Sequence, residues 1–190
     1  METPNKEFTI TVFTENNIGL LNRITIIFTR RHVNIESLTV SASEIPGVHR
    51  FTIVTNADED MVKKIVKQIE KLVEVLKANY YSHEEIIYQE ICLFKIPTSA
   101  LTYGSMAEEI IRKDNARILA VENDFAVIEK TGHREDTKEL FKKLEPFGIL
   151  QFVRSGRVAI TKHYKELHNY LKDLDEAKEY SVQYHQTIND

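Results

Sequence analysis

The residues of segment 16–40 have types and spacings that could do chemistry, and that chemistry is the binding of a small anion. An alternating strand pattern at 8–14 stops at Asn16, and from Leu20 the apolar spacing becomes that of a helix. Unpaired N–H groups at a helix start, together with the helix dipole, favour a carboxylate or a phosphate. Gly19 suits this loop because a backbone that approaches a ligand, or takes φ > 0, tolerates no Cβ. Most strand–glycine–helix connections are only tight turns, so that alternative stays open.

Two asparagines make an α-amino acid the ligand that suits this segment. Asn34 begins a second strand pattern at 34–40, and its amide, like that of Asn16, can both donate and accept hydrogen bonds. An amino acid needs donors for its carboxylate, acceptors for its ammonium group and an apolar niche for its side chain. The loop backbone, the two amides and the side chains of Ile18, Leu20 and Ile35 could supply all three. Asparagine is also a common turn and cap residue, so a purely structural role remains the alternative.

Catalytic motifs are absent from the sequence. The seven histidines are scattered, and no two have the i, i+4 spacing that lets one helix face hold a zinc ion. Neither glycine-rich phosphate-binding pattern occurs, and Cys92 has no activating neighbours in the sequence. Paired glutamates at 84–85 and 108–109 are typical of solvated helix faces. The sequence therefore predicts a chain with no catalytic site, metal or cofactor of its own.

Composition narrows the class of protein. A chain of 190 residues with 42% hydrophobic residues can form two small packed domains. Its formal net charge of −4 argues against a nucleic-acid-binding surface, and no apolar run of about 20 residues predicts a membrane span. The single cysteine, Cys92, excludes an internal disulfide and fits a reducing cytoplasm, with the residue buried in a strand.

The order of predicted elements is the same in both halves of the chain. In the first half we expect strands at 8–14, 34–40, 48–55 and 75–82 and helices at 20–28 and 59–76; in the second, strands at 87–96, 118–121, 125–128, 149–154 and 158–161 and helices at 106–111 and 137–144. Each order is βαββαβ, a ferredoxin-like unit of the α+β class. Its antiparallel sheet would carry both helices on one face, which leaves the other face and the outer edge for a second copy of the chain.

The end of the chain has its own pattern. From His163 onward the sequence is polar, but Tyr164, Leu167, Leu171 and Leu174 keep the spacing of an amphipathic helix. We expect this helix to pack on the second domain of its own chain, and the alternative is docking to a partner.

Several motifs of the chain follow the order and spacing of one protein family. They are Asn16-x-x-Gly19-x-Leu21-x-Arg23-Ile24, Phe28-x-x-Arg31-x-x-Asn34-Ile35-Glu36-Ser37-Leu38-Thr39-Val40, Arg50-Phe51-Thr52-Ile53, Gln68-Ile69-Glu70-Lys71-Leu72-Val73, Glu90-Ile91-x-Leu93-x-Lys95, Glu129-Lys130-Thr131-Gly132, Phe147-Gly148-Ile149 and Arg154-Ser155-Gly156-Arg157-Val158-Ala159. On these motifs, over residues 8–162, the chain resembles the small regulatory subunit of acetolactate synthase (acetohydroxyacid synthase). His32 departs from the family pattern, which usually has glycine there, and Ala120 stands where aspartate is common.

The resemblance implies an organisation and a function. It implies an N-terminal ACT domain at 1–83, a C-terminal ferredoxin-like, ACT-like domain at 84–162 and a helical or partly disordered extension at 163–190. Such a subunit has no catalytic site, activates a catalytic large subunit, and confers feedback inhibition by valine or a related branched-chain amino acid. Effectors of ACT domains bind at the dimer interface, between the strand-to-helix loop of one chain and the second strand of its partner. The implied effector-binding residues are Asn16, Ile18, Gly19, Leu20, Leu21, Asn34 and Ile35.

The resemblance also implies the partners. They are the large subunit, which would carry thiamine diphosphate, Mg²⁺ and FAD, and further copies of this chain in a homodimer or larger assembly, with neither nucleic acid nor membrane. A free-standing ACT-type amino-acid sensor that controls another enzyme is the alternative. A ferredoxin-like RNA-binding module would need a basic surface with aromatic platforms, and the acidic balance argues against it.

Overall fold

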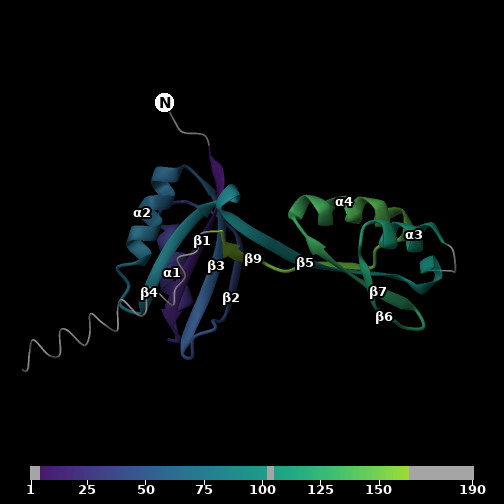
Figure 1. Cartoon of the computed structure of the whole chain (residues 1–190), viewed down its shortest axis with the longest axis horizontal. Coiled ribbons are helices and arrows are strands. Elements are labelled where there is room, and N and C mark those ends of the chain that lie inside the picture. Colours follow the sequence, from purple (N-terminus) through teal and green to yellow (C-terminus); the bar gives the residue numbers. More distant parts are fainter. Residues whose placement is uncertain (1–4, 102–104, 163–190) are drawn as a thin grey trace, which may run out of the picture. The chain divides into compact units, whose positions relative to one another are not determined.

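A computed structural model describes residues 5–101 and 105–162 of the chain. The first βαββαβ unit consists of β1 (Lys6–Glu15), α1 (Leu20–Thr29), β2 (Ile35–Ala42), β3 (Val48–Ala57), α2 (Glu59–Ile69) and β4 (Val75–Ser82) (Figure 1). Its sheet has the strand order β2-β3-β1-β4, and every neighbouring pair is antiparallel. The ferredoxin-like fold expected from the sequence is confirmed.

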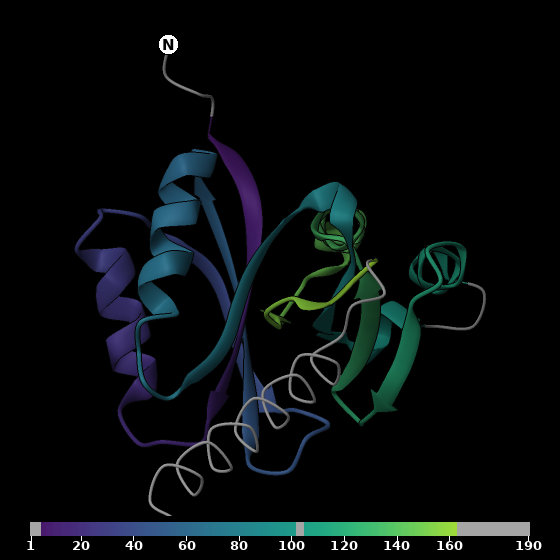
Figure 2. The same ribbon diagram turned by 60° about the vertical axis from the view of Figure 1, so that its left-hand side comes forward.

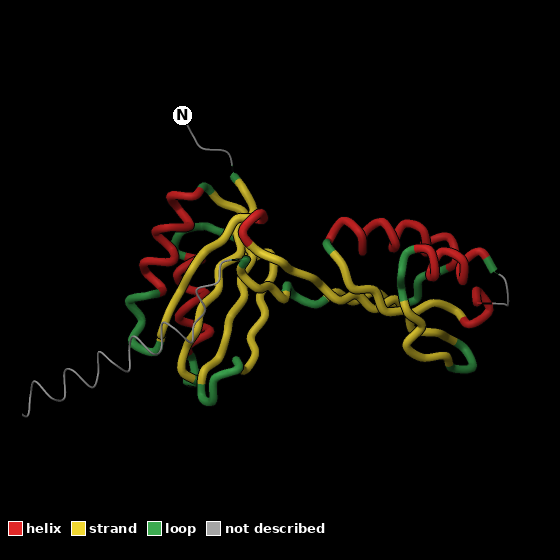
Figure 3. The backbone as a smooth tube through the Cα atoms, viewed as in Figure 1, coloured by secondary structure: helices red, strands yellow, loops and turns green. Residues whose placement is uncertain are grey.

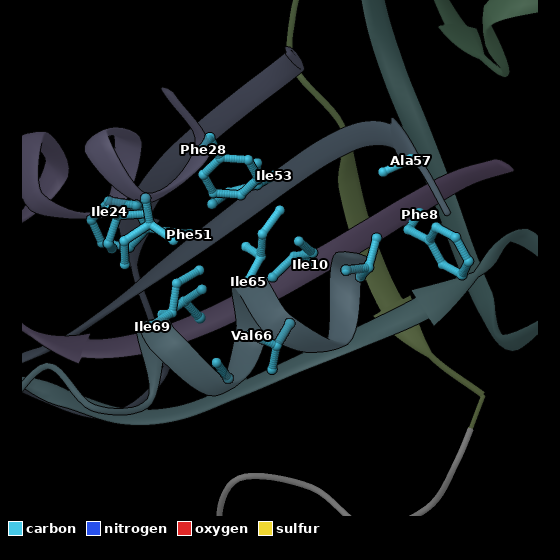
Figure 4. Packing of buried hydrophobic residues seen from close by; sticks show 14 of the residues in the cluster. Phe8, Ile10, Ile24, Phe28, Phe51, Ile53, Ala57, Ile65, Val66 and Ile69 are labelled. Carbon is cyan, nitrogen blue, oxygen red and sulfur yellow. The ribbon is translucent and has the colours of Figure 1, made fainter. Parts of the chain in front are cut away.

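The core of this unit lies between the sheet and its two helices. Alternate residues of β1, Phe8, Ile10 and Val12, face α1 and α2, because successive side chains of a strand point to opposite faces. Ile10 and Ile53 of the sheet and Ile65 of α2 meet there with no exposed surface (Figure 4). Burying each such side chain stabilises the fold by about 1.5–3 kcal/mol. Both helices therefore cover the same face of the sheet.

Local expectations differ from the structure in three places. The second helix ends at Ile69 instead of continuing to residue 76, because the chain turns there; Leu72 still packs on the core from the turn, whereas Val73 is 93% exposed. The helical apolar spacing that starts at Leu20 includes Leu21, but Leu21 is 45% exposed, whereas the buried residues of this helix are Leu20, Ile24, Ile27 and Phe28. The second strand begins at Ile35, one residue later than expected.

The second unit repeats the plan of the first. It consists of β5 (Ile86–Pro97), α3 (Met106–Lys113), β6 (Arg117–Val121), β7 (Phe125–Gly132), α4 (Arg134–Leu144) and β8 (Gln151–Arg154), with the short 3-10 helices His83–Glu85, Thr98–Leu101 and Glu145–Phe147 at the connections (Figure 3). The strand order β6-β7-β5-β8 matches that of the first sheet. Phe94 of β5, Ile111 of α3 and Leu140 of α4 meet in its core, and Cys92 is buried there as the sequence predicted.

The last described strand, β9 (Val158–Thr161), departs from the simple repeat. β9 pairs with the beginning of β5, and Ala159 packs with Ile86 and Tyr88. The residues before and within β9 contact the face of the first sheet that points away from α1 and α2 (Figure 2). Part of the face that we expected to be open for a second copy is therefore covered by the same chain.

Two further expectations concern the ends and boundaries of the chain. No helix in the described ranges is long and apolar enough to cross a membrane. The predicted helix at 163–190 lies outside the described residues, and the boundaries 1–83 and 84–162 remain predictions.

Candidate functional site

The loop between β1 and α1 is the centre of the candidate site. Gly19 has φ 83°, the left-handed conformation that the sequence analysis anticipated. It precedes α1 without any side-chain capping hydrogen bond, and the first turn of α1 carries no acidic residue. In contrast, Asp58 caps α2 and Ser105 caps α3, each followed by two acidic residues in the first turn. The start of α1 therefore has neither a capping side chain nor an acidic residue of its own first turn, which favours a negatively charged ligand there.

A salt bridge between two residues far apart in the chain anchors this loop. Arg23 in α1 contacts Glu74 at 2.6 Å between Nη2 and Oε1, and the backbone N–H of Glu15 donates to the carbonyl of Glu74 at 2.9 Å. The hydrogen bond from Arg23 lowers the pKa of the Glu74 carboxyl. Because these two residues are 51 positions apart, no local pattern could have joined them. The contacts hold the start of α1 against the turn that precedes β4.

The side chains predicted for the loop have different environments. Asn16 is exposed, and Ile18 is fully exposed at the tip of the loop. Leu20 is 1% exposed and belongs to the core, so its side chain supports α1 from below, while Leu21 lies on the outer surface. The side chains of Asn16, Ile18 and Leu21 are thus the predicted groups that a ligand can reach from outside.

Asn34 and Ile35 lie at the other end of the same sheet. Ile35 pairs with Thr55, and Thr55 pairs with Phe8 near the beginning of β1, whereas the loop follows Glu15 at its end. Seven residues of strand separate Phe8 from Glu15, which corresponds to about 24 Å at roughly 3.4 Å per residue. The structure therefore does not bring Asn34 together with Asn16 and Gly19 within one chain.

Local contacts hold Asn34 in place. Its side-chain amide donates to Glu36 Oε1 at 3.0 Å, and its carbonyl accepts from Thr55 Oγ1 at 2.7 Å. The Asn34 side chain is exposed, and Ile35 beside it is half-buried. Ile35 is the first residue of β2, which forms one edge of the sheet, and Asn34 directly precedes it. From this position, Asn34 and Ile35 could contact a second copy of the chain with no change in the fold of the first.

His32 explains one departure from the family pattern. Its φ is 53°, in the left-handed region that L residues adopt at a cost and glycine adopts freely. The turn from α1 to β2 therefore favours glycine at this position for a conformational reason. Having histidine there adds backbone strain next to Asn34 but leaves the turn intact.

The described part of the chain has no group of three or more His, Cys, Asp or Glu side chains that could hold a metal ion. Cys92 has no exposed surface, and Arg154 Nε donates to its sulfur at 3.4 Å. Polar contacts of the described residues gather instead around the loop and around two arginines near β9, the half-buried Arg154 and the buried Arg157.

Both halves of the chain match families of known proteins. Residues 10–77 match the family model described as the AHAS small subunit-like ACT domain, and residues 89–163 match the model described as the small subunit of acetolactate synthase. The acetolactate synthase small subunit of Bacillus subtilis is 36% identical over 154 residues, which cover 80% of this chain and 89% of that one. The chain belongs to the acetolactate synthase small subunit family. A small subunit of this synthase has a catalytic partner, and the family resemblance inferred from the motifs is confirmed.

Two more relatives extend the comparison. The probable acetolactate synthase small subunit of Archaeoglobus fulgidus is 34% identical over 158 residues, covering 83% of this chain and 98% of that one. The crystal structure of the small subunit from Thermotoga maritima superposes with a TM-score of 0.75 at 27% identity, covering 84% of this chain and 99% of that one. The similarity therefore spans both βαββαβ units.

Proposed function

We propose that the chain is the regulatory subunit of a cytoplasmic acetolactate synthase, which activates the catalytic subunit and inhibits it when valine or a related branched-chain amino acid binds. Thiamine diphosphate, Mg²⁺ and FAD belong to the catalytic subunit in this proposal. The effector binds between two copies of the chain. The loop 16–21 of one copy supplies Asn16, Gly19 and the uncapped N-terminal end of α1, and the other copy supplies Asn34 and Ile35.

The positions of these residues on the sheet carry the proposal. Gly19 and Asn34 lie at opposite ends of the sheet, and β2 is an edge strand with unpaired backbone groups. If β2 pairs antiparallel with β2 of a second copy, the partner strand runs the other way, so its beginning lies at the end where the first copy has its loop. A two-fold dimer then forms two equivalent sites, each from both chains. The partial cover on the sheet face by β9 also favours pairing at this edge over stacking of faces.

Inhibition follows from linkage. An effector that binds more tightly to one arrangement of the dimer shifts the assembly toward that arrangement, and the shift is limited by the difference in affinity. If this arrangement holds the catalytic subunit in a less active state, valine lowers the rate without entering the catalytic site. A ligand bound by both chains must also stabilise the dimer by mass action.

Reconstitution tests the proposal. The purified chain is mixed with the catalytic subunit, and acetolactate formation is measured with and without valine, leucine or isoleucine; we expect a higher rate on addition of the chain and a lower rate with at least one of the amino acids. Light scattering of the chain alone at micromolar concentration should give at least the mass of a dimer. A chain that binds an amino acid but neither co-elutes with the catalytic subunit nor changes its rate would favour the free-standing sensor.

A further inference from the structure

The turn formed by residues 154–157 connects the two units of the chain through buried contacts. We name it the Arg154–Arg157 turn. Its backbone is held to β5, because the N–H of Ser155 donates to the carbonyl of Ile91 at 2.8 Å and the N–H of Ile91 donates to Ser155 Oγ at 2.9 Å. The arginines at its two ends are bound in different units.

Arg154 is bound in the second unit. Its Nη2 donates to Thr137 Oγ1 at 2.8 Å, and its Nε lies 3.5 Å from Glu90 Oε2. Thr137 on α4 has no exposed surface and Glu90 on β5 is 5% exposed, so this is an interior contact between a helix and the sheet. Glu90 Oε2 has no hydrogen-bond partner of its own, which leaves the buried carboxylate dependent on the nearby guanidinium for its electrostatic balance.

Arg157 is bound on the sheet of the first unit. Its Nη2 contacts Glu7 Oε1 at 2.7 Å, its Nη1 donates to Thr9 Oγ1 at 2.8 Å, and its Cζ lies 3.7 Å from the centre of the Tyr88 ring. The side chain is 2% exposed, which makes it the largest fully buried side chain among the described residues. Burial raises the pKa of the Tyr88 phenol, so the ring stays neutral beneath the cation. A long cationic side chain is thus ordered completely on the face of β1.

Gly156 touches β2 directly. A Cβ on Gly156 would lie 2.1 Å from Thr39 Oγ1 and 3.3 Å from the carbonyl oxygen of Leu38. The backbone N–H of Arg157 donates to Ser37 Oγ at 3.2 Å. These β2 residues follow Ile35, the first residue of the strand, within a few positions. Glycine suits this position because a Cβ would collide with the hydroxyl groups that Ser37 and Thr39 of β2 direct at the turn.

We propose that the Arg154–Arg157 turn positions β2, the strand that begins at Ile35 directly after Asn34, and couples it to α4 and β5 of the second unit. The proposal rests on the proposed function for the identity of the ligand, but the coupling itself is a property of this chain. An effector that moves β2 would move Gly156 and Arg157, and through Arg154 the same displacement reaches Thr137 and Glu90. The residues of the turn are positioning residues, since none of them belongs to the proposed effector site.

The coupling is tested first without any ligand, by hydrogen exchange on the full chain. Arg154→Met removes the contacts in the second unit, and we expect amide exchange at residues 37–39 of β2 to rise by about fivefold or more while α1 is unchanged. Arg117→Met is the matched control, because Arg117 also belongs to the second unit and also forms an ion pair, with Glu129 at 2.6 Å. Thr137→Val is the milder variant if Arg154→Met does not fold. Unchanged exchange in β2 in a variant that loosens α4 would overturn the proposal.

A rescue experiment tests the contact at Gly156. Gly156→Ala should raise exchange in β2, because the new methyl group cannot fit beside Thr39 Oγ1. The double variant Gly156→Ala with Thr39→Ala removes that clash and should return exchange to within about twofold of wild type. Thr39→Ala alone is the control, and it breaks no hydrogen bond because Thr39 Oγ1 has no partner. No rescue, or no effect of Gly156→Ala, would count against direct contact as the means of coupling.

The effector experiment uses valine with the reconstituted synthase. We expect Arg157→Met to bind valine with a Kd close to that of wild type while the half-inhibitory concentration rises at least about fivefold, and Arg117→Met to change neither. An unchanged ratio of half-inhibitory concentration to Kd in Arg157→Met would refute transmission through the turn. If wild type binds none of valine, leucine and isoleucine, the proposed function fails, and the exchange measurements still decide whether the turn couples the two units.

Discussion

A carboxylate placed at Gly19 is the sharpest test of the effector site. Gly19 has φ 83°, and no heavy atom lies within 4 Å of the place where a Cβ would be. Any substitution here therefore meets backbone strain but no steric clash. Gly19→Asp adds a negative charge at the uncapped start of α1, in the position proposed for the effector carboxylate. Gly19→Asn has nearly the same shape without the charge and is the matched control.

The expected magnitudes separate folding from binding. The left-handed conformation costs an L residue about 1–2 kcal/mol, and Asn and Asp adopt it more readily than most. A domain of ordinary stability, about 5–15 kcal/mol, remains folded after such a loss. Hydrogen bonds from backbone N–H groups to a charged ligand contribute about 1.5–3 kcal/mol, so their loss should raise the Kd for the effector by about ten- to a hundredfold. Repulsion between the two carboxylates adds to that loss, and we expect inhibition to be abolished while activation persists.

Calorimetry with valine, denaturant unfolding and inhibition of the reconstituted synthase measure these effects together. We expect Gly19→Asp and Gly19→Asn to have similar unfolding midpoints and only Gly19→Asp to lose valine binding and inhibition. Equal losses in both variants would show that the backbone conformation matters and the charge does not. Wild-type inhibition of Gly19→Asp would remove Gly19 from the site.

Three further predictions concern the strand, the turn and the anchor of the loop. Asn34→Ala should weaken valine binding, measured by calorimetry, by about 1–3 kcal/mol, and it should erase the valine-induced rise in dimer stability, measured by dissociation on dilution. Wild-type affinity for valine in this variant would mean that Asn34 only caps the turn. His32→Gly should leave the unfolding free energy unchanged or raise it by up to about 1 kcal/mol, because it relieves φ 53°, whereas Thr25→Gly inside α1 should lower it; a lower unfolding free energy in His32→Gly would contradict the presence of strain at φ 53°. The hydrogen bond from Arg23 lowers the pKa of Glu74 from its usual 4.5, so the stabilisation that this pair gives the fold is present above that pH and is lost as the pH falls through the folded-state pKa. The denaturant midpoints of wild type and Glu74→Gln should therefore converge on acidification below 4.5. A difference between the two midpoints that stays constant with pH would refute this prediction.

The sequence predicted the local elements well, because their signals are local. Alternation in β1, the turn at Gly19 and the helical spacing after it each depend on residues within one or two turns of one another. The extent of α2 was wrong for the same reason: apolar residues continue at helical intervals to residue 76, but Leu72 reaches the core from a turn that the pattern could not distinguish from a helix. Similarly, the apolar spacing includes Leu21, but Leu20, Ile24, Ile27 and Phe28 form the buried face of α1 and Leu21 is 45% exposed.

The sequence by itself determined the βαββαβ order, the left-handed glycine before α1 and the family of the chain, because period, turn chemistry and motif spacing are properties of neighbouring residues. Only the tertiary structure decided that Asn34 and Gly19 lie at opposite ends of one sheet, since strand order and register depend on pairings between residues far apart in the chain. The same holds for Arg157, whose ion pair with Glu7 joins residues 150 positions apart. Charge and spacing along the chain do not predict such contacts, because they form only when the folded chain brings distant residues together and buries Arg157.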